Sequence, residues 1–171
     1  MKFLLLINFL FFAVCFSQKK EFDLDQVSSK DYSIRFDSNY FSRMDGSDQS
    51  VILFIKNPNE DYLELLKISV EDVSKHKNMD LQYFSELREY ALKDQYKILS
   101  KTKGELNGSQ YIDFIYEKTT VRGNNKYDFK NLERLYFHQF KIYKIFFNSS
   151  KSDYEKHFPR IEQILKSFQM K

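Results

Sequence analysis

The sequence predicts an α+β protein in which an antiparallel β-sheet meander packs against two main helices. Apolar and polar residues alternate through much of the chain, as they do in half-buried strands. An Asn-Gly pair at 107–108 joins two such segments, which is typical of a tight β-hairpin. Apolar residues recur at helical spacing in two segments, 81–91 and 154–168, so these are the expected helices.

The first seventeen residues are typical of a cleavable export signal. Lys2 precedes the apolar run Phe3 to Val14, and the small residues Cys15 and Ser17 stand at positions −3 and −1 of a cleavage site after Ser17. The apolar run is shorter than the stretch of about 20 residues that a spanning helix needs. We therefore expect residues 1–17 to be a signal peptide, with no stable membrane span after cleavage.

Lipid attachment at Cys15 is the alternative to free release. A lipoprotein signal has Leu or a similar residue three positions before the cysteine and a small residue directly before it, where this chain has Phe12 and Val14. The pattern favours cleaved export, and the mature protein is expected in the periplasm or outside the cell.

Composition predicts one domain that folds without disulfides. Cys15 is the only cysteine, and the predicted cleavage removes it. Eighteen Phe and twelve Tyr provide an aromatic core, whereas four Gly leave no glycine-rich phosphate loop. The net charge of the whole chain is only +3 and the basic residues are interspersed, so no nucleic-acid partner is expected.

The first half of the mature chain predicts a tether, a strand and a hairpin. Residues 18–30 are polar and form a tether or a strand that starts late, and the single domain is expected over 31–171. Residues 32–36 alternate as in a strand, and 39–49 are a turn region.

A hairpin is predicted around the turn Asn57–Asp61, with strands at 50–55 and 62–73. In its second strand the apolar residues move from odd to even positions after Leu65. This change predicts a bulge or a bend.

The first helix is predicted to begin after the N-cap residue Asp80. Its expected apolar face consists of Leu81, Phe84, Leu87 and Ala91. The charged residues Glu86, Arg88, Glu89 and Lys93 are expected on a solvated face.

The second half predicts a meander and a closing helix. The expected strands are 96–106, 109–121, 131–138 and 141–148, with turns at 107–108 and 122–125. In the closing helix, Pro159 predicts a separate first piece from Asp153 to Phe158, with the proline at the start of the main helix.

Three segments carry a resemblance to a known family: Asp31–Phe36, Gly108–Tyr111 and Phe158–Phe168. In these segments and in the order of its elements, the chain over about 31–168 resembles the PsbP-like superfamily, which includes PsbP photosystem proteins, Mog-type Ran-binding factors and DcrB-type bacterial envelope proteins. It departs from many members at Asp37, where they carry a proline. The resemblance implies a PsbP-like α/β sandwich. Because members act mainly as accessory or binding proteins and share no catalytic residues, it also implies a non-catalytic role.

No residue set in the sequence matches a catalytic or metal-binding motif. There is no Gly-x-Ser-x-Gly elbow and no cysteine after position 15. Asp72, His76 and Asp80 stand four apart, but they fall in a predicted loop, and the pair His138 and His157 lacks a third ligand. We expect no enzyme activity, no cofactor and no metal site.

The aromatic residues of the meander are the remaining candidate surface, and Tyr116, Tyr127, Tyr136 and Tyr143 are the possible partner-binding side chains. Consecutive aromatics such as Tyr136-Phe137 point to opposite faces of a strand. Either helices cover both faces of the sheet, or one aromatic face is exposed for a partner.

These observations predict an exported, non-catalytic binding or accessory protein of the bacterial envelope or secreted fraction, with a protein as its partner. The alternative is a carrier that holds a small apolar ligand in a pocket between sheet and helix.

Mass spectrometry of the exported protein tests the predicted processing. We expect a mature chain that begins at Gln18, because cleavage after Ser17 satisfies the small-residue rule. A lipid-modified N-terminus at Cys15, or a chain that retains Met1, would contradict this prediction.

Overall fold

The computed structural model describes residues 24–46, 50–56 and 63–171. In chain order the elements are β1 (Leu24–Ser28), β2 (Tyr32–Asp37), β3 (Phe41–Asp45), β4 (Val51–Ile55), β5 (Leu65–Asp72), α2 (Leu81–Lys93), β6 (Lys97–Leu106), β7 (Ser109–Arg122), β8 (Asn125–His138), β9 (Lys141–Ser150), α3 (Tyr154–Ser167) and β10 (Gln169–Met170). The predicted signal peptide, residues 1–17, lies outside the described residues.

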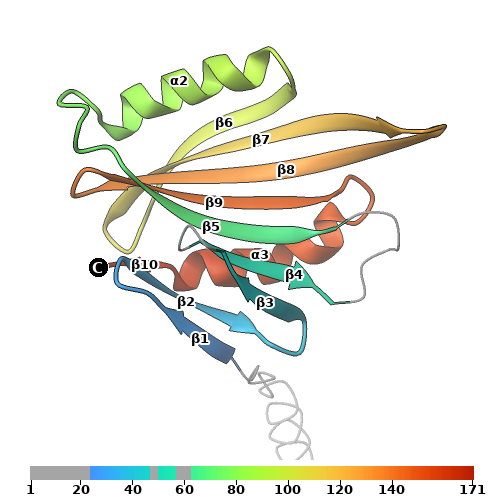
Figure 1. Cartoon of the computed structure of the whole chain (residues 1–171), viewed down its shortest axis with the longest axis horizontal. Coiled ribbons are helices and arrows are strands. Elements are labelled where there is room, and N and C mark those ends of the chain that lie inside the picture. The colour runs from blue at the N-terminus through green and yellow to red at the C-terminus, as the bar shows by residue number, and fades with distance from the viewer. Residues whose placement is uncertain (1–23, 47–49, 57–62) are drawn as a thin grey trace, which may run out of the picture.

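The described strands form an antiparallel seven-stranded sheet in the order β3-β4-β5-β9-β8-β7-β6, and a small sheet in the order β1-β2-β10. Helix α2 lies over one face of the large sheet, and α3 lies against the other face together with the small sheet (Figure 1). The α+β prediction, with an antiparallel meander and two main helices, is confirmed. Neither described helix has the length and hydropathy that crossing a membrane requires.

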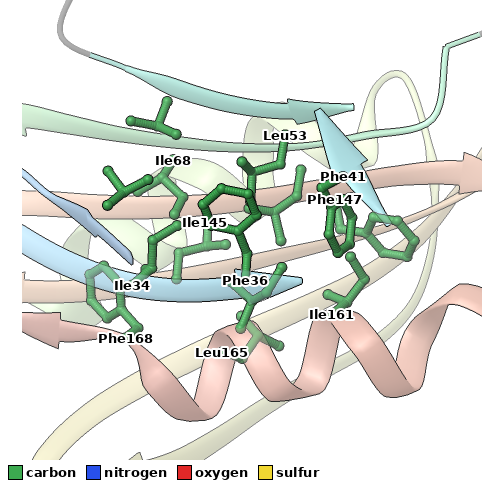
Figure 2. Close-up of a cluster of buried hydrophobic side chains, with 14 of the residues drawn as sticks. Ile34, Phe36, Phe41, Leu53, Ile68, Ile145, Phe147, Ile161, Leu165 and Phe168 are labelled. Atoms are coloured by element: carbon green, nitrogen blue, oxygen red, sulfur yellow. The ribbon is translucent and has the colours of Figure 1, made fainter. Parts of the chain in front are cut away.

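Both faces of the large sheet are covered by packed side chains. Toward α3, side chains of β2, β4, β5, β9 and α3 interlock in one buried cluster, which includes Phe36, Leu53 and Leu165 (Figure 2). Toward α2, a second cluster joins Leu92 of the helix to residues such as Phe114 of β7. Of the two alternatives for the aromatic meander, the structure therefore shows burial on both faces.

The predicted hairpin turn at 107–108 is confirmed. Asn107 and Gly108 have φ angles of 52° and 75°, the positive values that a two-residue type I′ turn requires at both positions. The pairing of β6 with β7 runs directly up to this turn, where Leu106 faces Ser109.

The second predicted hairpin is confirmed in its pairing, but the expected bulge is wrong. Strand β4 pairs with β5 without a register shift, and the predicted turn at 57–61 lies outside the described residues. Leu63 is 60% exposed, while Glu64 is buried on the same side as Leu66 and Ile68. The apolar pattern changed parity because a leucine is exposed and a glutamate is buried, not because the strand is bulged.

Strand β1 is the late-starting strand that was one of the two alternatives for residues 18–30, and three other strand assignments differ from the sequence predictions. Strand β3 lies inside the predicted turn 39–49, β8 begins at Asn125 instead of 131, and β10 was not predicted. β1 and β3 each bury a single side chain, Val27 and Phe41 respectively. Short strands of this kind show little alternation because pairing with a neighbour, rather than a buried face, keeps them extended.

Helix α3 is continuous, so the predicted break before Pro159 is wrong. The helix runs from Tyr154 to Ser167 with the proline inside it. Tyr154 and His157, which precede the proline, are both buried. Their anchoring keeps the first turn helical although Pro159 has no N–H to donate.

Helix α2 begins as predicted but faces the sheet differently. Asp80 caps it, since its Oδ1 accepts a 2.7 Å hydrogen bond from the Tyr83 N–H. Leu87 and Ala91, expected on the apolar face, are exposed. Arg88, expected in solvent, points toward the sheet and donates hydrogen bonds of 2.6 and 2.7 Å to the two carboxylate oxygens of Glu133.

The ion pair between Arg88 and Glu133 joins α2 to β8. The carboxylate side chain is only 1% exposed, and its hydrogen bonds raise the pKa of Arg88, so the guanidinium stays charged beside it. An uncompensated buried charge is far more costly than an exposed one. This ion pair therefore sets which face of helix α2 lies against the sheet, an orientation that the apolar residues of the helix alone would not give.

Replacing Arg88 tests this role. We expect Arg88→Met to lower the free energy of unfolding by about 3 kcal/mol, because Glu133 stays buried without its counter-charge. Urea denaturation at neutral pH measures the change. The control is Lys93→Met on the same helix, where the side chain is 63% exposed and we expect a loss of no more than about 0.5 kcal/mol. Equal stability of the two variants would contradict the proposed anchor.

Candidate functional site

Three of the four predicted partner-binding aromatics are buried. Tyr116, Tyr136 and Tyr143 are 3%, 1% and 1% exposed, and only Tyr127 is partly accessible. The rings of Tyr136 and Tyr143 pack on Phe168, with centroid distances of 5.1 and 6.0 Å. Tyr116, Tyr136 and Tyr143 are therefore core residues in the described structure, which corrects their assignment to an exposed binding face.

Tyr127 lies on a hairpin that projects from the sheet. The pairing of β6 with β7 ends at Glu117, and the pairing of β9 with β8 ends at Phe129. Residues 118–128 therefore continue as a two-stranded arm without further strand neighbours, which reaches out at one end of the molecule (Figure 1). We refer to residues 118–128 as the arm.

The arm presents cationic and apolar side chains. Its basic residues are Lys118, Arg122 and Lys126, and its only acidic residue is Asp128. The pairing of β7 with β8 puts Lys118, Arg122 and Tyr127 on one side of the arm. Val121, on the other side, is 67% exposed. This combination of accessible cations and partly exposed hydrophobic groups is suited to a contact surface.

The residue sets considered for metal binding do not come together. Hydrogen bonds from the Ser74 side chain and from its N–H lower the pKa of the Asp72 carboxyl, and Asp80 is occupied as the cap of α2. His138 lies beside Phe168 at the C-terminal end of α3, whereas His157 lies near the start of that helix.

A buried polar cluster that the sequence analysis missed lies between β5 and the start of α3. Glu64 and His157 are 2% and 4% exposed, and Glu64 Oε2 lies 2.8 Å from His157 Nε2. Glu64 Oε1 accepts hydrogen bonds of 2.6 Å from Ser149 Oγ and 3.0 Å from the Ser150 N–H. Both carboxylate oxygens are thus held by groups of β9 and α3.

The cluster continues beyond this pair. The Tyr40 hydroxyl contacts His157 Nδ1, so both ring nitrogens of the histidine have partners. Burial raises the pKa of Tyr40, although Arg160, 4.1 Å from its ring centroid, opposes this effect. Asp153 Oδ2 accepts a 3.0 Å hydrogen bond from Ser150 Oγ. We call Glu64, His157, Tyr40 and Asp153 the Glu64 cluster.

Two features of the sequence indicate this cluster. Glu64 has the parity of Leu66 and Ile68, and His157 falls at helical spacing with Tyr154 and Ile161. A polar residue on each of two apolar faces indicates that the two faces meet around a polar contact. The assumed bulge in β5 obscured the parity of Glu64.

Replacing Tyr40 tests the stabilising role of the cluster. We expect Tyr40→Phe to lower the free energy of unfolding by about 1–2 kcal/mol, because His157 Nδ1 loses its buried partner while the ring keeps its contact with Arg160. Urea denaturation measures the change, and Tyr127→Phe on the arm is the matched control, with little expected loss. A Tyr40→Phe protein as stable as the control would show that the hydroxyl contributes nothing.

Comparisons with known proteins show the fold. No family model and no curated protein matches the sequence. The structure is similar to the solution structure of cyanobacterial PsbP (CyanoP) from Synechocystis sp. PCC 6803, with a TM-score of 0.65 and 12% identity over 91% of this chain and 96% of that one. It is also similar to PA94 from Pseudomonas aeruginosa, described as a protein of unknown function and putative regulator, with a TM-score of 0.58 and 12% identity over 84% and 94% of the two chains.

Proposed function

Because the chain has the PsbP-like fold, we propose that it is an exported, non-catalytic binding protein of the bacterial envelope or secreted fraction, and that the arm contacts a protein partner. The observation that carries this proposal is the projection of residues 118–128 beyond every neighbouring strand. A hairpin that contributes to no described core cluster is free to be shaped by what it binds.

The chemistry of the arm favours an acidic protein surface as its partner. Arg122 makes no ion pair with any described residue, and Lys118 lies above the ring of Tyr96, 5.8 Å from its centroid. Cations placed in this way guide the approach of an acidic surface, while Tyr127 supplies amphipathic contact area.

The packing between sheet and helix does not favour the carrier alternative. A carrier needs an enclosed apolar cavity there. Toward α3 this space is occupied by Ile145, Phe147, Ile161 and Leu165, each no more than 1% exposed (Figure 2). Toward α2 it is occupied by the second core cluster, in which Leu92 and Phe114 are fully buried. The proposal therefore keeps a protein partner and not a small apolar ligand.

Site-specific photo-crosslinking in the exporting cell tests the arm. A photoreactive residue at Asn124, at the tip, is expected to give a discrete adduct with an acidic protein. The control is the same residue at Lys77, in the loop before α2 at the opposite end of the molecule (Figure 1). Absence of an adduct at the tip, or the same adduct at both positions, would overturn the assignment of the arm.

Charge reversal gives a second test. We expect Lys118→Glu with Arg122→Glu to abolish the adduct formed at Asn124, because the arm would then repel an acidic partner. The matched control reverses Lys75 and Lys77, which changes the net charge equally away from the arm. An adduct that survives the arm reversal would contradict the electrostatic basis of the contact.

A further inference from the structure

We propose that the Glu64 cluster binds one divalent transition metal ion through His157 Nε2, a Glu64 carboxylate oxygen and an Asp153 carboxylate oxygen. This site is independent of the arm and goes beyond the proposed binding function. One ligand atom from each of the three residues lies within 4.8 Å of the other two. The cluster also holds two carboxylates, and a divalent cation neutralises both.

The donor geometry is close to that of a bound site. Ligand atoms at about 2.0–2.2 Å from one Zn²⁺ are roughly 3–4 Å apart. Glu64 Oε2 and His157 Nε2 lie 2.8 Å apart, just under this range, and the Asp153 side chain brings a carboxylate oxygen within 4.8 Å of a ligand atom of each. That side chain is 17% exposed, which gives it room to turn and gives an ion a path from solvent.

The surrounding groups are those that orient metal ligands. A ligating histidine binds through one nitrogen and donates its other N–H to a fixed acceptor. Tyr40 is placed for this, because its hydroxyl oxygen contacts His157 Nδ1 while Nε2 faces Glu64. Ser149 Oγ and the Ser150 N–H hold the second oxygen of Glu64, so the carboxylate is fixed on the side away from the ion.

The ligand types select the class of metal. One imidazole and two carboxylates suit Zn²⁺ and Mn²⁺, whereas Mg²⁺ and Ca²⁺ prefer oxygen ligands alone and Cu⁺ prefers sulfur. The nearby cations are Arg160, stacked on Tyr40, and Lys156, 3.8 Å from Asp153 Oδ1. Lys156 is exposed and flexible, so it can withdraw when an ion binds.

Calorimetric titration of ZnCl₂ and of MnCl₂ into the chelator-treated protein, the chain from Gln18 onward, tests the site. That chain contains every described element. We expect saturable one-to-one binding of at least one of the two ions, and no comparable binding of MgCl₂ or CaCl₂. A wild-type protein that binds neither Zn²⁺ nor Mn²⁺ with this stoichiometry would overturn the proposal.

Variants locate the ion. We expect His157→Asn and Asp153→Asn each to weaken binding by about 100-fold or more, and Tyr40→Phe, which only positions His157, by about 10-fold. Asp153→Asn is the variant best suited to keep the fold, since an amide oxygen still accepts from Ser150. Far-ultraviolet circular dichroism confirms folding of each variant before titration.

The other two histidines of the chain are the matched controls. His76→Asn and His138→Asn are expected to bind the ion as tightly as the wild type. Loss of binding in either control, or unchanged binding in a folded Asp153→Asn protein, would assign the ion elsewhere and overturn the proposal. These titrations do not involve the arm. The metal site can therefore be disproved while the crosslinking at the arm succeeds, and the arm can be disproved while the metal binds.

Discussion

Both faces of the seven-stranded sheet carry large apolar side chains, and the need to cover both faces determines where the other elements lie. Neighbouring residues of β9 show this, since Ile142 belongs to the core beneath α2 and Tyr143 to the core beneath α3. On the face toward α3 the helix and the small sheet share the core, since β2 contributes Ile34 and Phe36 to it. The small sheet is thus part of the core and not an appendage.

Each helix is also fixed to the sheet by a buried charged or polar contact. Arg88 of α2 meets Glu133, and His157 of α3 meets Glu64. Apolar surfaces pack nearly as well after a small slide, whereas a buried carboxylate loses its partner completely. These contacts therefore define the position of each helix more than they add to stability.

The sequence predicted correctly those elements in which the residues with an apolar pattern are also the residues that are buried in the structure. The alternation in β7 and the Asn-Gly turn predicted the central hairpin, and the spacing of Tyr154, Ile161 and Leu165 predicted α3. It was insufficient where a partner distant in sequence decides the structure. Strand β3 exists because β4 lies beside it, and Arg88 faces inward because Glu133 is 45 residues away in the chain. The same reason hid the Glu64 cluster, whose members come from three segments that are far apart in the chain.

The segment from Ser149 to Glu155 connects the cluster to the base of the arm. Ser149 and Ser150 hold Glu64, while Lys151 bonds to Glu117 at 2.6 Å and Glu155 accepts a 2.7 Å bond from Lys130. Glu117 and Lys130 are paired at the root of the arm. A movement of Asp153 toward an ion would therefore act on the residues that orient the arm. Thermodynamic linkage makes such coupling reciprocal, so a metal that changes the affinity for a partner must have its own affinity changed by the same factor.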